Sequence, residues 1–162
     1  MGYTLEIYAI SYVDLLRKIR DLALLETLRP RSQEEDQDWR QGVRQLFEGS
    51  LSGDNAAAVF SALVRSIGRP LVALQHASKS GIIFREVVSR LLQSNGEPTL
   101  NRPIESLYRD DLPWFGWLLW KEMSSRSVST DVNTDVRGWE ADVEAALDFA
   151  RQHCLDVITI YT

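Results

Sequence analysis

Segments with the pattern of a β-strand occur at the two ends of the sequence, and their placement constrains the fold most. Residues 2–10 alternate between two faces of an extended strand, with Leu5 and Ile7 on one of them. Residues 155–161 are rich in the β-branched side chains that favour strands. Because two strands are marginally stable by themselves, we expect them to pair and to be covered by helices.

The residues between these strands favour helices. Apolar side chains recur there at three- and four-residue spacings, and Gly or Pro follows several of the runs. We expect an α+β fold, predominantly helical, with about six helices covering a small sheet that pairs the N- and C-terminal strands. A further short strand in the middle of the chain is compatible with this pattern. Six of the predicted helices cover 11–28, 32–47, 54–67, 83–92, 114–120 and 139–150, and two further, short helices are predicted over 70–77 and 104–108.

The length and composition are those of one globular domain, residues 1–162. The formal net charge of -5 argues against non-specific binding of nucleic acid, which needs a basic surface, and permits a basic partner. The first residues do not form a signal peptide, and no apolar run approaches the ~20 residues that cross a bilayer. We therefore predict a cytoplasmic protein that does not bind membranes.

Reactive side chains are few, and each has a structural interpretation. Cys154 is the single cysteine, which excludes an internal disulfide, and we predict that it is a small core residue. His153 is expected to serve the end of the last helix, and His76 to lie in a polar turn over 76–81. Glycines at 49 and 53 lack the rest of a phosphate-binding motif and predict a connection between helices. We predict no catalytic residue, no metal site and no cofactor.

The segment from Leu112 to Trp120 contains three tryptophans and has three interpretations. On a helix, Trp114, Trp117 and Leu118 would share a face, and apolar residues all round predict a central core helix. Alternatively, one or two exposed tryptophans form a surface for a partner, because tryptophan is enriched at binding hot spots. A ligand pocket lined by the same rings is the third interpretation.

Three features stand out in the layout of the whole chain: the opening Met1-Gly2-Tyr3 before a strand, the internal tryptophan-rich segment, and Cys154-Leu155-Asp156 between a helix and a β-branched strand. In these features the chain resembles the YfbM-like family of bacterial proteins. The resemblance implies no activity and no site residues. Proteins of this size and acidity often act by binding a partner, as immunity proteins that neutralise a toxin do.

The leading hypothesis is a non-enzymatic protein-binding module, an immunity or regulatory protein whose partner is a basic toxin or a complex subunit. Its predicted surface combines the polar loop 125–138 with the tryptophan-rich segment. The candidate binding residues are Trp114, Trp117, Trp120, Asp131, Asp135 and Trp139.

Two alternatives stay open. The first is a small enzyme or ligand-binding protein, in which polar side chains near the predicted turn converge on a pocket. The residues of that pocket would be His76, Ser78, Arg85 and Arg102. The second is a subunit of a larger bacterial complex, and the sequence does not predict an oligomeric state.

Overall fold

The computed structural model describes residues 2–31, 33–48, 51, 53–77, 113–118, 120 and 140–162. Within these residues the protein has the predicted α+β fold, with five helices and four strands. The elements are β1 (Gly2–Ile10), α1 (Tyr12–Ile19), α2 (Leu22–Thr27), α3 (Gln33–Phe47), α4 (Asp54–Ile67), β2 (Arg69–Ala77), β3 (Trp114–Leu118), α7 (Glu140–Gln152) and β4 (Asp156–Tyr161). The helices predicted over 83–92 and 104–108 lie outside the described residues.

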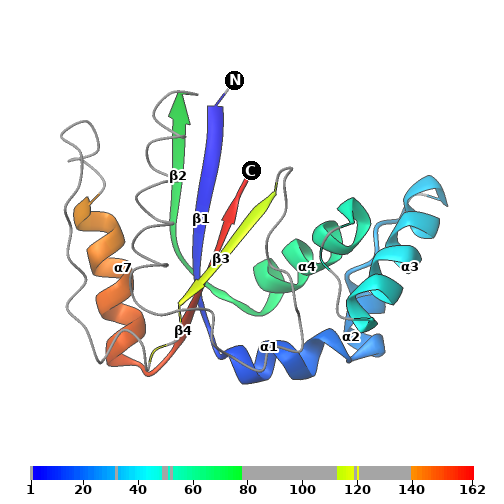
Figure 1. Ribbon diagram of the computed structural model, residues 1–162, viewed down its shortest axis with the longest axis horizontal. Helices are drawn as coiled ribbons and strands as arrows, with labels where there is room; N and C mark the ends of the chain where they lie inside the picture. Colours follow the sequence, from blue (N-terminus) through cyan, green and yellow to red (C-terminus); the bar gives the residue numbers. More distant parts are fainter. Residues whose placement is uncertain are drawn as a thin grey trace.

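The predicted pairing of the first and last strands is confirmed. The sheet has the order β2-β1-β4-β3, and all three pairings are antiparallel. In the centre of the sheet, Tyr8 of β1 lies opposite Ile158 of β4. The N–H of Thr4 donates to the carbonyl of Thr162 at 2.6 Å, and the two ends of the chain lie side by side (Figure 1).

The prediction of a short helix over 70–77 is wrong, because these residues belong to β2. The strand pairs with β1, and the register shifts where Ile7 lies opposite Val72 and Tyr8 opposite Pro70. Proline has no N–H to donate, and it occurs in sheets mainly at edges and bulges. A short helix would leave most of its backbone groups without partners, whereas pairing with β1 satisfies them.

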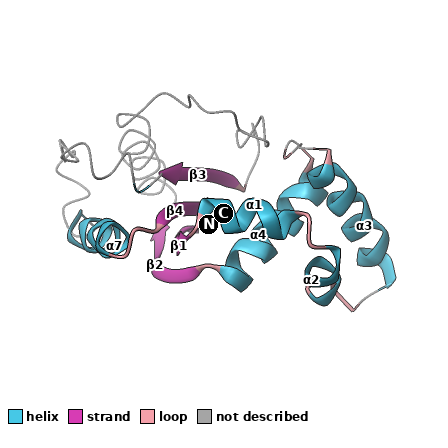
Figure 2. Cartoon of the chain, turned by 90° about the horizontal axis from the view of Figure 1, so that it is seen from below, coloured by secondary structure: helices cyan, strands magenta, loops and turns pink. Residues whose placement is uncertain are grey.

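Helices cover both faces of the sheet. The first four helices lie on one side and α7 on the other (Figures 1 and 2). On the side of the first four helices the sheet contributes buried side chains to the main core, namely Tyr8, Ile10, Phe115, Ile158 and Ile160. Two buried residues of β1, Ile7 and Ala9, lie outside that cluster. The buried residues of α7 also lie outside it, namely Ala146, Leu147 and Ala150. This explains why β1 is apolar on both of its faces.

The helix predicted over 11–28 is divided in two. α1 begins as predicted, with the Ser11 hydroxyl accepting from the Asp14 N–H at 3.3 Å. The Asp21 carboxylate then accepts from the Leu24 N–H at 3.1 Å and starts α2. Aspartate is among the best N-terminal caps of helices, so a new helix begins at Asp21 although the apolar spacing continues through it.

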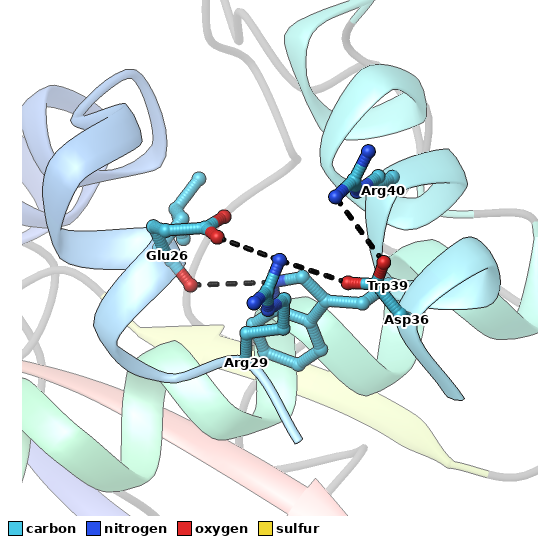
Figure 3. Close-up of polar contacts among 6 residues, drawn as sticks. Glu26, Arg29, Asp36, Trp39 and Arg40 are labelled. Atoms are coloured by element: carbon cyan, nitrogen blue, oxygen red, sulfur yellow. Dashed lines mark hydrogen bonds and ion pairs between the residues drawn. The ribbon is translucent and has the colours of Figure 1, made fainter. Parts of the chain in front are cut away.

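α2 packs on α3 through a buried tryptophan and a group of charged side chains (Figure 3). The indole N–H of Trp39 donates to the Leu25 carbonyl at 3.2 Å, so the buried ring has a partner for its polar atom. Beside it, Arg29 lies 2.8 Å from the Glu26 carboxylate and 3.0 Å from that of Asp36. Partly exposed ion pairs of this kind contribute little stability, so we expect the burial of Trp39 and Leu25 in the main core to matter more for this packing.

Candidate functional site

The tryptophan-rich segment is a strand and not the core helix that its composition predicts. β3 pairs with β4, and Trp117 lies opposite Ile158. A short apolar run fits a strand buried in a sheet as well as it fits a buried helix, and periodicity does not separate the two. Since Trp114 and Trp117 are three residues apart on a strand, the shared helical face predicted for them does not exist.

The structure describes only some of the residues that were predicted for the binding surface and for the alternative pocket. His76 lies in β2 opposite Tyr3, so its predicted place in a polar turn is wrong. Trp120 lies just beyond β3 and is partly buried. The other candidates lie outside the described residues, namely Asp131, Asp135, Trp139, Ser78, Arg85 and Arg102. Of the predicted surface, Trp120 is therefore the residue around which a site can be built.

A buried carboxylate holds Trp120 next to the start of α1. Asp156 is the first residue of β4, and it is 8% exposed. Its Oδ1 accepts from the Trp120 N–H at 2.8 Å, and its Oδ2 accepts from the Tyr12 N–H at 2.7 Å. Tyr12 is the first residue of α1, where N–H groups have no partner within the helix and negative charge is favoured.

We refer to Tyr12, Val13, Trp120 and Asp156 as the Asp156 junction. Val13 follows Tyr12 directly and is 57% exposed. Each carboxylate oxygen of Asp156 lies within 2.8 Å of its donor, so the Tyr12 and Trp120 backbones are neighbours although the residues are far apart in sequence. A partly exposed tryptophan such as Trp120 is a suitable anchor for a protein partner, because tryptophan is enriched at binding hot spots.

A second polar cluster, which the sequence analysis missed, joins α4 to β1. Arg65 donates two hydrogen bonds to the Glu6 carboxylate, at 2.8 and 2.9 Å, and the Tyr8 hydroxyl donates to the same carboxylate at 2.5 Å. The bonds from Arg65 lower the pKa of Glu6, against the opposing effect of burial. Burial, and then the bond to Glu6, raise the pKa of Tyr8 to about 12. The alternation in β1 places Glu6 and Tyr8 on one face, but nothing in the sequence points to Arg65.

The polar cluster of Glu6, Tyr8 and Arg65 predicts that the protein loses stability in alkali. The raised pKa of Tyr8 means that the folded protein holds this proton more tightly than the unfolded chain does. Its contribution to the free energy of unfolding is complete below pH 10.0 and is lost as the pH rises to about 12. Titration of tyrosinate absorbance should show one of the five tyrosines ionising near that upper value.

Two variants check the assignment of this titration. Tyr8→Phe should remove the late tyrosinate step and make the free energy of unfolding less dependent on pH in this range. Glu6→Gln, which keeps a similar shape but removes the charge, should move the step toward pH 10.0. A late step that persists in Tyr8→Phe would show that another tyrosine is responsible.

The end of α7 corrects the interpretation of Cys154. The residue is exposed, and its φ of 53° places it in the left-handed region, so the prediction of a core residue is wrong. The Leu155 N–H donates to the Ala150 carbonyl at 2.9 Å, as in a Schellman motif, and this turn directs Cys154 away from the core. His153 serves the helix end as predicted, with its Nδ1 2.8 Å from the Phe149 carbonyl and its ring stacked on that of Phe149.

The described residues define no metal-binding or membrane-spanning feature. Among them, no three His, Cys, Asp or Glu side chains gather closely enough to hold a metal ion. Within the same part of the chain, no helix has the length and apolar character needed to cross a bilayer. Comparison with protein-family models, with curated proteins and with solved structures found no match.

Proposed function

We propose that this chain is a non-enzymatic, cytoplasmic protein-binding module whose partner contacts the Asp156 junction. The observation that carries the proposal is that Asp156 joins the backbone of the partly buried Trp120 to the start of α1, where the Val13 side chain is exposed. The Trp120 N–H donates to the buried Asp156 carboxylate, and so does the N–H of Tyr12, the residue before Val13. An anchor that is already ordered loses little conformational freedom when a partner binds.

The charge of the chain supports a basic partner. The formal net charge is -5, and a field of this sign accelerates association with proteins of opposite charge. An immunity protein that neutralises a basic toxin, or a regulatory protein with a basic target, fits this description. Capture of such a partner should weaken as the salt concentration rises, because ions screen long-range attraction.

The test is capture of partners from a lysate of the native host with tagged wild-type and Val13→Asp protein. The aspartate would lie in the first turn of α1, where the helix dipole favours negative charge, so the fold should be retained. Placing a charge in the centre of the contact should reduce the recovery of a specific partner about tenfold, the loss expected for an anchor residue. Trp120→Ala should reduce the recovery of the same partner.

Leu22→Asp is a matched control for Val13→Asp. Leu22 is 59% exposed and lies in the first turn of α2, so the chemical change and the helical position are alike. The two sites are separated by α1, which is roughly 12 Å long at the usual rise of a helix. If the wild-type, Val13→Asp and Trp120→Ala proteins recovered every captured protein in equal amounts, the proposed function would be contradicted.

A further inference from the structure

We propose that β4 exchanges between two copies of this chain and so forms a dimer, which we call the exchanged dimer. β4 lies between β1 and β3 and pairs with both of them in antiparallel register (Figure 2). Its side chains are part of the core, and Val157, Ile158 and Ile160 are each at most 1% exposed. Without β4, the facing edges of β1 and β3 would present unpaired backbone groups. The sheet is therefore complete only when a strand occupies this position, and this inference does not depend on the proposed function.

A second copy supplies a strand that fits the position, because its β4 has the same sequence. The pairing of β4 with β1, in which Ile158 lies opposite Tyr8, re-forms when β4 comes from another molecule. The same holds for the pairing with β3, in which Ile160 lies opposite Phe115. The contacts of the strand are thus equal in the monomer and in the exchanged dimer. The equilibrium between them depends on the protein concentration and on the conformation of the connection before β4.

Residues 153–155 connect α7 to β4, and this connection is strained in the folded monomer. Cys154 has a φ of 53°, in the left-handed region that disfavours residues with a Cβ atom, and glycine is the usual residue at this position of a helix end. The turn is closed by the Cys154 and Leu155 N–H groups, which donate to the carbonyls of Arg151 and Ala150 at 3.3 and 2.9 Å. Because Cys154 is exposed, water can replace the partner of its N–H at little cost. An extended Cys154 would relieve the strain and direct β4 away from its own sheet, so this hinge favours exchange.

Exchange is slow in the folded protein. β4 leaves its position only when its pairings with β1 and β3 both break, which requires the centre of the sheet to open. The proportions of monomer and exchanged dimer are therefore set during refolding, and the two forms can be separated afterwards. Refolding at a protein concentration on the order of 1 mM, near the effective concentration of a segment on a short connection, should yield a measurable dimer fraction.

The first test varies the hinge. Cys154→Val introduces a β-branched side chain, which tolerates the left-handed region poorly, whereas Cys154→Gly removes the strain. After refolding at the same concentration with a reducing agent, the ratio of dimer to monomer should be at least about tenfold higher for Cys154→Val than for Cys154→Gly. Cys154→Ser keeps a Cβ atom but lacks the thiol, so it should match the wild type. Size-exclusion chromatography with light scattering measures the ratio.

The second test identifies the strand that crosses between the copies. Thr4 and Thr162 lie opposite each other, because each N–H donates to the carbonyl of the other, at 2.6 and 2.9 Å. Thr4→Cys and Thr162→Cys, combined with Cys154→Ser, can therefore form a disulfide between β1 and the residue after β4. Oxidation of the isolated dimer should link its two chains covalently on a non-reducing gel, because β1 of one copy pairs with β4 of the other. In the isolated monomer the same disulfide should form within one chain.

Three results would overturn the proposal. The first is that neither the wild type nor Cys154→Val forms a dimer after refolding at about 1 mM. The second is a dimer in which the disulfide between positions 4 and 162 lies within each chain, because its copies would then associate without exchange. The third is an equal ratio of dimer to monomer for Cys154→Val and Cys154→Gly. If Cys154→Val does not fold, the ratio for Cys154→Ser must still exceed that for Cys154→Gly.

Discussion

Substituting Gly42 by alanine is expected to lower the free energy of unfolding by about 3 kcal/mol, at the upper end of the range for overpacking. Gly42 lies in α3 where this helix crosses α4. A Cβ atom on Gly42 would lie 2.3 Å from the Asn55 carbonyl oxygen and 2.8 Å from a methyl group of Val59. The closest neighbour is backbone, which cannot rotate away, so the two helices would have to separate.

Helix propensity predicts the opposite sign. Alanine is more favourable than glycine inside a helix by about 1 kcal/mol. The measurement is chemical denaturation of Gly42→Ala, with Ala58→Gly as a control at an exposed position of α4. The control should lose about 1 kcal/mol from propensity alone. A Gly42→Ala protein more stable than the wild type would show that α3 and α4 do not approach so closely.

Phe60→Ala should lower the free energy of unfolding by about 4 kcal/mol, the usual loss for a buried phenylalanine. Phe60 is 1% exposed and lies in the main core between α4 and the sheet. Its ring meets that of Phe115 edge to face, with the ring centres 4.9 Å apart. Removing the ring would leave a cavity between the layers and take away its contact with Phe115 of β3.

Phe47→Ala is the control for this substitution. Phe47 is 43% exposed at the end of α3, and the same chemical change there should cost no more than about 1 kcal/mol. Phe60→Leu, which keeps most of the volume, should lie between the two alanine variants. If Phe60→Ala and Phe47→Ala lost equal stability, Phe60 would not be a central core residue.

The predictable parts of the fold are those in which local pattern and tertiary contacts agree. α4 follows its apolar spacing and ends at Gly68, as predicted, and α1 begins at the Ser11 cap. The strands at the two ends were predicted from alternation and β-branched content. Their pairing follows because each exposes backbone groups that the other satisfies.

The candidate site was predicted much less well. Tryptophan content indicated the segment that contains Trp120, and the description of Trp120 as a site residue stays a prediction. Asp156 was named merely as part of the sequence between a helix and a strand, without a role. The signal that could have found it is weak, since an aspartate before a β-branched run is common and its two donors lie in remote segments.

By itself the sequence determined the fold class, the pairing of the terminal strands and the approximate course of α1, α3, α4 and α7, because helical periodicity and β-branched content are local properties. Tertiary structure decided that 69–77 and 114–118 are strands, that Cys154 faces solvent and that Trp120 meets the start of α1. In each of the two strands, backbone groups find partners in a strand far away in sequence. Short apolar segments adopt whichever conformation their neighbours can satisfy, and their own side chains do not specify it.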